Sequence, residues 1–183
     1  MTYLRSFILL LSLLLSRTAL AQSVFPLPVF KVTTTEGKEI DSSYFRGTIT
    51  WINFFYEGCG PCMKEIPLLV RLQKYYGEKK LRIIGIAPHS PSQVKGFAER
   101  KKTQGVEINY TLAGECPEDG QTSMSPRCHP VSQLFGVTNY PTSVITDAKG
   151  NILMSIEGFP MRSNDEETFQ EMLKLIDGFL NQK

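Results

Sequence analysis

The chain has 183 residues, of which 42% are hydrophobic and 21% charged, with 14 Gly, 11 Pro and a net charge of +2. These values are close to those of average globular domains, so they exclude a disordered chain, a collagen-like repeat and a coiled coil. The length suits one ordinary domain with a sizeable core. Four cysteines are too few for a disulfide-dense mini-protein, so each needs its own explanation.

Residues 1–21 have the pattern of a cleaved signal peptide. Arg5 precedes an apolar run from Phe7 to Leu15, and Ala19-Leu20-Ala21 forms a small-x-small cleavage site. The alternative is an uncleaved membrane anchor, but the run is well short of the roughly 20 apolar residues that span a bilayer. We therefore expect export to the periplasm or another extracytoplasmic space, where disulfides persist.

Cleavage there would leave residues 22–183 as the folded domain, without net charge, because it removes two basic residues and no acidic one. A neutral chain has no electrostatic footprint for nucleic acid or for an anionic membrane surface. No nucleic-acid partner is predicted.

The first half of this domain predicts strands and one helix. A hairpin is expected from Val32–Thr35 and Lys38–Ile40. Thr48–Tyr56 is dense in β-branched and aromatic residues, which is typical of a buried central strand. Cys62–Lys79 has apolar residues along one helical face, with Pro67 expected to kink it.

The alternation continues beyond this helix. Leu81–Ala87 predicts a strand, and Ser90-Pro91-Ser92-Gln93 combines an N-cap, a first-turn proline and a capping-box glutamine that begin a helix. Val106–Leu112 is predicted as a third strand. A polar loop from Ala113 to His129 and a short helix around Val131 to Phe135 follow.

The last part predicts a hairpin and a helix. Ser143–Thr146 and Ile152–Ile156 flank a turn at Asp147-Ala148-Lys149-Gly150, and Ser163 with Glu166 forms a capping box before an amphipathic segment. Together the elements predict an α/β fold with one mixed sheet, in which the first three strands are parallel and the final pair is antiparallel.

The chemistry is expected at Cys59-Gly60-Pro61-Cys62, between the buried strand and the first turn of a helix. Amides at a helix N-terminus stabilise a thiolate on the first cysteine. Pro61 suits an early helical position, because its missing N–H would have had no partner inside the helix. Cys59 is thus placed to attack a disulfide, and Cys62 to resolve the product.

Half a zinc site and a static disulfide are the alternatives for this motif. A structural zinc site needs a second close pair of ligands, whereas Cys116 and Cys128 are twelve residues apart. The strand-to-helix context therefore favours a redox pair. We expect no metal and no cofactor other than the disulfide itself.

The segment Trp51–Cys62 (WINFFYEGCGPC) resembles the active-site strand of the thioredoxin superfamily, and particularly that of exported TlpA/ResA-like thiol-disulfide oxidoreductases. The similarity continues through Met63–Pro67, resumes at Phe135–Thr142 and runs from Asp147 to Gly158. The resemblance implies a thioredoxin-like fold: a central mixed β-sheet flanked by helices, with an N-terminal β-hairpin extension and an inserted αβ unit.

The resemblance also implies site residues. Pro141 matches the proline that is cis beside the CxxC motif in this superfamily, where an exposed backbone edge would let a substrate peptide pair in extended form. Glu65 matches a buried acid that exchanges a proton with the resolving cysteine in ResA-like proteins. The alternative for Glu65 is a solvated residue in the first helical turn. Asn53 stands where thioredoxin has a buried aspartate, which makes Glu65 the better candidate acid.

The expected substrate surface departs from the family pattern at two residues. Gly58 replaces the tryptophan that usually precedes the first cysteine, which predicts a barer surface around Cys59. Tyr140 is a bulky residue before the proline, and we expect it to contact substrate together with Gly60 and Pro61.

Two polar residues near the motif are interpreted as structural. Glu57 is expected to be a solvated loop charge, which would slightly oppose thiolate formation on Cys59. His89 is expected to be a hydrogen-bonded loop histidine rather than a ligand or proton donor.

Cys116 and Cys128 bracket a loop that is longer than the connection usual in the family. If the preceding strand is parallel to the central one, this loop leaves from the sheet end that carries Cys59. A structural disulfide is favoured for it in an oxidising compartment. The alternatives are a second redox pair that exchanges electrons with Cys59 and Cys62, or two thiols or metal ligands near His129.

The predicted activity is thiol-disulfide oxidoreduction, with the protein acting as a monomeric reductant of disulfides in substrate proteins. The resemblance implies that a membrane thiol-disulfide carrier recharges it, often in the service of cytochrome c maturation. A Sco-type copper chaperone would need three residues between the cysteines and a histidine near the proline loop. A peroxiredoxin-like antioxidant protein would need threonine and proline where Tyr56 and Ile52 stand. The sequence has neither pattern.

Overall fold

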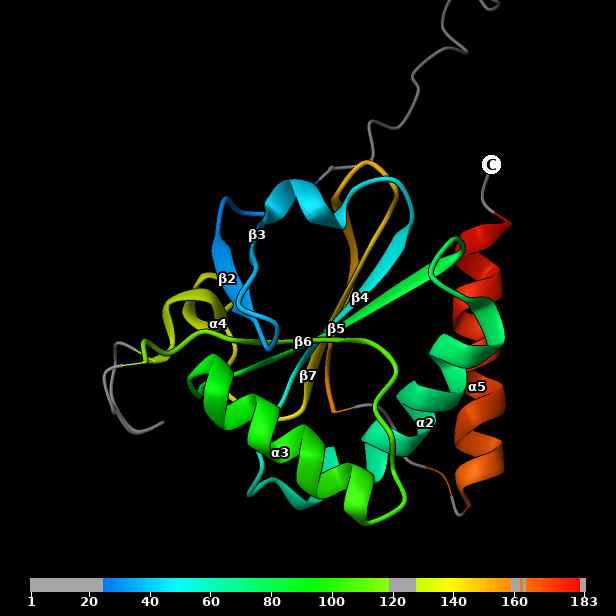
Figure 1. Cartoon of the computed structure of the whole chain (residues 1–183). Coiled ribbons are helices and arrows are strands. Elements are labelled where there is room, and N and C mark those ends of the chain that lie inside the picture. Colours follow the sequence, from blue (N-terminus) through cyan, green and yellow to red (C-terminus); the bar gives the residue numbers. More distant parts are fainter. Residues whose placement is uncertain (1–24, 119–127, 159–161, 163, 182–183) are drawn as a thin grey trace, which may run out of the picture.

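The computed structural model describes residues 25–118, 128–158, 162 and 164–181. Their strands form one sheet in the order β1-β8-β7-β4-β5-β6-β2-β3, with helices on both faces (Figure 1). The predicted signal segment, residues 1–21, lies outside the described part of the chain. Within that part, no helix is both long enough and apolar enough to cross a membrane.

The strands are β1 (Phe25–Pro26), β2 (Lys31–Thr34), β3 (Glu39–Asp41), β4 (Ile49–Phe54), β5 (Leu81–Ala87), β6 (Thr111–Gly114), β7 (Thr142–Thr146) and β8 (Asn151–Glu157). The helices are the 3-10 helix η1 (Ser42–Phe45) and the α-helices α2 (Gly60–Tyr76), α3 (Pro91–Thr103), α4 (Pro130–Leu134) and α5 (Asp165–Leu180).

The predicted topology is confirmed. Strands β4, β5 and β6 run parallel, while β7 is antiparallel to both β4 and β8. The N-terminal hairpin, β2 and β3, extends the sheet because β2 pairs with β6. Helix α3 and strand β6 supply the expected inserted αβ unit. The two-residue strand β1, which the sequence patterns did not predict, pairs with β8 at the other edge.

Alternation along β4 divides the core into two hydrophobic clusters. Trp51 points to the face covered by α2, α3 and α5, whereas Ile52 and Phe54 point to the face covered by η1 and α4. All three side chains are fully buried. The central strand is therefore enclosed on both faces, and its carboxyl end leads directly to the first cysteine.

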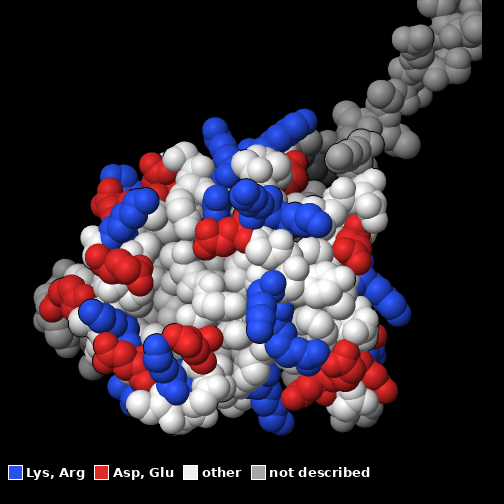
Figure 2. All heavy atoms as spheres, turned by 45° about the vertical axis from the view of Figure 1, so that its right-hand side comes forward, with Lys and Arg blue, Asp and Glu red and all other residues white. Residues whose placement is uncertain are grey.

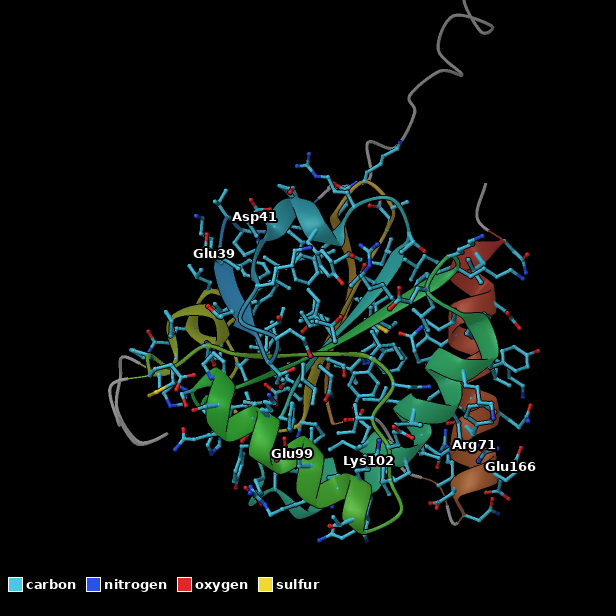
Figure 3. All side chains as sticks on the ribbon, viewed as in Figure 1. Glu39, Asp41, Arg71, Glu99, Lys102 and Glu166 are labelled. Carbon is cyan, nitrogen blue, oxygen red and sulfur yellow. A yellow bond between two sulfur atoms is a disulfide. The ribbon has the colours of Figure 1, made fainter. Side chains whose placement is uncertain are left out.

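An ion pair and a cation–π contact join α2 to α5 at the edge of the first cluster. Arg71 Nη2 lies 2.7 Å from Glu166 Oε2, and the guanidinium of Arg71 stacks over the ring of Phe169, 4.0 Å from its centroid (Figure 3). Because the two charges are exposed, the ion pair adds little to the free energy of unfolding. Arg71 contributes to stability mainly because its side chain covers the ring of Phe169.

The third parallel strand differs from the predicted one, which was Val106–Leu112. Pairing begins only at Thr111 opposite Ile84 and continues to Gly114, so Ala113 belongs to the strand and not to a loop. The preceding residues leave the sheet and run alongside α2 (Figure 1). Asn109 Nδ2 there donates to the carbonyl of Val70 at 3.2 Å. Tertiary packing overrides the local β-propensity of this segment.

Three helix boundaries also differ. Helix α2 begins at Gly60, two residues before the predicted start at Cys62. Helix α2 runs unbroken through Pro67 and ends at Tyr76, three residues before the predicted end, because Gly77 adopts φ +66° and stops it. Helix α5 is capped by Asn164, whose side chain accepts from the Glu167 N–H at 2.8 Å. Ser163, the predicted cap, lies outside the described residues.

Gly114 allows the end of β6 to approach the loop after β5. A Cβ at this position would lie less than 3.0 Å from backbone atoms of His89, Ser90 and Pro91. Gly114→Ala is therefore expected to lower the free energy of unfolding by about 1–3 kcal/mol in urea denaturation. Gly178→Ala is the matched control, because it is exposed within α5 with open space around it, and it should stabilise slightly. Equal effects of the two changes would contradict the packing argument.

Candidate functional site

Cys59 and Cys62 form a disulfide at the N-terminus of α2. Cys59 is the N-cap residue, and its sulfur accepts from the Cys62 N–H at 3.1 Å. Cys59 is 4% exposed and Cys62 1%, while Gly60 and Pro61 between them are exposed. A thiolate on Cys59 would face the free amides of the first helical turn, which stabilise negative charge.

The strand next to β4 brings Pro141 toward this motif. Thr142, the first residue of β7, pairs with Phe54, the last residue of β4. The Tyr140–Pro141 peptide bond is cis, as the resemblance implied. Pro141 is buried, and its carbonyl accepts from the Gly158 N–H at 2.6 Å.

Tyr56 and Tyr140 form an aromatic pair beside the disulfide. Their rings meet edge to face, with centroids 5.3 Å apart, and the Tyr56 carbonyl accepts from the Cys59 N–H. The Tyr56 ring lies against Gly58, where a Cβ would clash with it. The surface before Cys59 is thus covered by Tyr56 and is less bare than the missing tryptophan suggested. Tyr56 was not among the predicted substrate-contacting residues, although its place three residues before Cys59 was a usable signal.

Glu65 is buried, so its interpretation as a solvated residue is wrong. Its side chain is on α2, one turn after Cys62, and only 2% of the residue is exposed. Burial raises its pKa to about 7, and the hydrogen bond from Asn53 Nδ2 at 2.9 Å opposes that rise. Burial, and secondarily the Glu65 charge, raise the pKa of Tyr110. The site thus contains a buried carboxyl group whose pKa is raised toward neutral pH.

A short buried network orients this acid. Asn53 Nδ2 also lies 3.2 Å from Ser143 Oγ, and Ser143 Oγ accepts from Trp51 Nε1 at 2.7 Å. Glu65 Oε1 and Asn53 Oδ1 are buried without a hydrogen-bonding partner among the described residues. A protonated Glu65 costs less in this setting than a charged one. Ser143, on β7, was not singled out from the sequence, because only the strand pairing brings it to Asn53.

Glu57 and His89 lie near the motif. Glu57 is exposed, as expected, and its carboxylate receives two hydrogen bonds from Arg100, at 2.8 and 3.1 Å. His89 is half-buried and lines a small pocket with Phe55, Glu57 and Phe97. Burial lowers the pKa of His89, and the Glu57 charge partly opposes this.

Cys116 and Cys128 form a second disulfide, at the sheet end that carries Cys59. Both are buried; Cys116 follows β6, and Cys128 precedes α4. The pairing was predicted, whereas its role as a structural or a redox disulfide stays a prediction. Neighbouring Glu115 is also buried, and burial raises its pKa against the hydrogen bonds that it accepts from the Ser132 and Val131 N–H groups. The sequence patterns did not identify Glu115.

A metal site or a charged binding surface would be another kind of functional site among the described residues. Across residues 25–118 and 128–158 with the described C-terminal part, no group of three or more His, Cys, Asp or Glu side chains is arranged to hold a metal ion. Acidic and basic side chains are interspersed over the face that Figure 2 shows.

The chain is similar in sequence to several known proteins. The AhpC/TSA family pattern matches residues 25–155. The thiol-disulfide oxidoreductase ResA of Bacillus thuringiensis subsp. konkukian is 29% identical over 150 residues, which cover 81% of this chain and 75% of the relative. ResA of Bacillus anthracis is 30% identical over 132 residues, covering 72% of this chain and 67% of the relative.

Solved structures share the fold. A thiol:disulfide interchange protein of the thioredoxin family from Chlorobium tepidum TLS is 29% identical, with a TM-score of 0.61 over 87% of this chain and 99% of that one. A thiol-disulfide isomerase from Corynebacterium glutamicum has a TM-score of 0.63 at 18% identity, over 86% of this chain and 98% of that one, and so shows likeness of fold.

Proposed function

Because this chain belongs to the AhpC/TSA family and is a ResA-like thiol-disulfide oxidoreductase of the thioredoxin superfamily, we propose that it acts as a reductant of disulfides in exported proteins. The observation that carries the proposal is the Cys59–Cys62 pair at the helix N-terminus, one turn before the buried acid Glu65. The relatives named ResA support a redox role for this pair. The substrate class, disulfides of exported proteins, is part of this proposal.

The reaction has two thiol-disulfide exchanges. The Cys59 thiolate attacks one sulfur of a substrate disulfide, forming a Cys59–substrate bond and releasing the other substrate sulfur as a thiolate. The Cys62 thiolate then attacks Cys59, forming the Cys59–Cys62 disulfide and releasing the second substrate thiolate. Two electrons pass from the protein to the substrate. Glu65 accepts the Cys62 proton when that thiol becomes a nucleophile, for which a pKa near 7 is well matched.

Substrate binding is assigned to the residues around the exposed Gly60 and Pro61. An extended substrate segment would lie against Tyr140 and pair with the backbone before Pro141. A membrane thiol-disulfide carrier would return two electrons to the Cys59–Cys62 disulfide after each turnover. We further propose that the protein is exported after cleavage near Ala21 and works as a monomer in the extracytoplasmic space.

A redox titration of residues 22–183, with mass-spectrometric mapping of each cysteine pair, tests the proposal. A Cys59–Cys62 potential near −270 mV, about that of thioredoxin, is expected for a reductant. A value near −120 mV, about that of a strong oxidant, would contradict it and assign disulfide formation instead. In the same experiment, Cys116–Cys128 should stay oxidised below about −300 mV if it is structural.

A further inference from the structure

Tyr140 is held in place from several sides. Its partly buried ring packs against both hydrophobic clusters, one of which contains Cys59 and Cys62. The ring also meets Tyr56 edge to face, and its hydroxyl lies 3.5 Å from His129 Nδ1. These contacts fix one orientation of the ring next to the cis bond. The aromatic wall, defined as Tyr56 and Tyr140, is therefore held in position before a substrate arrives.

His129 is in turn positioned by the start of α4. Its carbonyl accepts from the Gln133 N–H at 3.0 Å and from Ser132 Oγ at 3.3 Å. Its Nδ1 lies 3.4 Å from the same Ser132 Oγ. The imidazole thus bridges the first turn of α4 and the Tyr140 hydroxyl, so a shift of this turn would move the contact on Tyr140.

A disulfide and a pair of hydrogen bonds connect the first turn of α4 to the sheet. The first is covalent, the Cys116–Cys128 disulfide, whose second cysteine directly precedes His129. The second is the Glu115 carboxylate, whose Oε2 accepts from the Val131 and Ser132 N–H groups, each at 2.8 Å. Both start at the end of β6, where the Glu115 N–H donates to Ala87 and the Cys116 N–H to His89. The turn is thereby fastened to the same sheet end as the reactive disulfide.

We propose that the Cys116–Cys128 disulfide is a brace for substrate recognition, which acts through His129 to hold Tyr140 against Tyr56. His129 is a positioning residue in this arrangement, and the disulfide keeps its helical turn in register with the sheet. A wall that is ordered beforehand loses less conformational freedom when a peptide binds across it. This inference rests on the proposed function and assigns the second disulfide to binding rather than to electron transfer.

The test compares a protein substrate with a small disulfide. The Cys59–Cys62 pair is reduced selectively, and thiol trapping with mass spectrometry verifies that Cys116–Cys128 is intact. The reduced protein is then mixed with insulin or with Ellman's reagent in single-turnover experiments. For His129→Ala, the half-saturating insulin concentration should rise roughly two- to threefold, as expected for loss of one long, weak hydrogen bond. The maximal rate with insulin and the rate with Ellman's reagent should not change.

Two further variants separate positioning from general loosening. His129→Gln keeps a side-chain donor and acceptor, and should restore most of the wild-type insulin affinity. Gln133→Ala, an exposed change on the same helix, should have no effect. Equal losses with insulin and Ellman's reagent, or no recovery in His129→Gln, would overturn the proposal.

The disulfide itself is tested by the paired change Cys116→Ser with Cys128→Ser. Its effect on insulin affinity should not add to that of His129→Ala, because both changes act through the contact between His129 and Tyr140. Additive effects would overturn the brace. If the paired variant does not fold, the insulin affinities of His129→Ala and His129→Gln test the proposal on their own. If wild-type protein reduces Ellman's reagent but not insulin, the proposed function fails; if it reduces insulin with unchanged affinity in His129→Ala, only the brace fails.

Discussion

Cys59→Ser is expected to lower the rate of insulin reduction by at least about 10³-fold, because a serine hydroxyl cannot replace the thiolate as a nucleophile at neutral pH. The helix N-terminus that stabilises a Cys59 thiolate gives no comparable activation to a hydroxyl, whose proton is held much more tightly. The measurement is the turbidity of reduced insulin with dithiothreitol as electron donor. Activity within tenfold of wild type would contradict the assigned nucleophile.

Cys62→Ser is the matched variant. It separates the attack of Cys59 on the substrate disulfide from the resolution of the mixed disulfide by Cys62. Cys59 still attacks, but the mixed disulfide can no longer be resolved from within the CxxC motif, so it should accumulate. Non-reducing electrophoresis and peptide mapping should show insulin attached to Cys59. Attachment at Cys116 or Cys128 instead would place the second pair in the electron path.

Glu65→Gln is expected to have the second large effect, on both resolution and pH dependence. Without this acid near Cys62, release of reduced insulin from the mixed disulfide should slow by roughly tenfold or more near pH 7. Formation of the mixed disulfide, which depends on Cys59, should be nearly unchanged. Stopped-flow measurement of the two phases distinguishes them. Glu99→Gln, at an exposed position on α3 (Figure 3), is the control and should change neither phase.

The same substitution should also change how stability depends on pH. The pKa of Glu65 is about 7 in the folded protein, against an ordinary value of 4.5. Between these values the unfolded chain releases the proton that the folded chain keeps, so the free energy of unfolding should fall as pH rises from 4.5 to 7. The loss is on the order of 3 kcal/mol. In Glu65→Gln, this fall in the free energy of unfolding between pH 4.5 and 7 should be absent. Parallel pH profiles for the two proteins would show that Glu65 does not titrate in this range.

Local sequence patterns determined much of the fold. The capping box at Ser90 and Gln93 is present, with Pro91 as the first residue of α3. The turn after β7 forms as predicted, since the Asp147 carboxylate accepts from the Lys149 and Asn151 N–H groups. These features involve residues within four positions of one another, so propensity and short hydrogen bonds are sufficient to specify them.

The redox motif was equally visible in the sequence. The strand-to-helix context predicted that Cys59 lies beside the amides of a helix N-terminus, and in the structure it is the N-cap residue. The resemblance added the cis bond before Pro141 and the buried state of Glu65, and the structure has both. From the residues alone, a solvated place in the first turn of a helix remained an alternative for Glu65, because burial depends on what packs over a residue.

Tertiary structure decided the features that depend on residues far apart in the chain. The segment before Thr111 leaves the sheet because α2 offers it a partner at Val70. The contacts between Tyr56 and Tyr140 and between Tyr140 and His129 exist only because β7 pairs with β4 and because α4 is fastened to the end of β6. A local pattern identifies which residues can react or form a turn. The environment that shifts the pKa of Glu65 and orders the aromatic wall arises only when distant strands and helices close around the site.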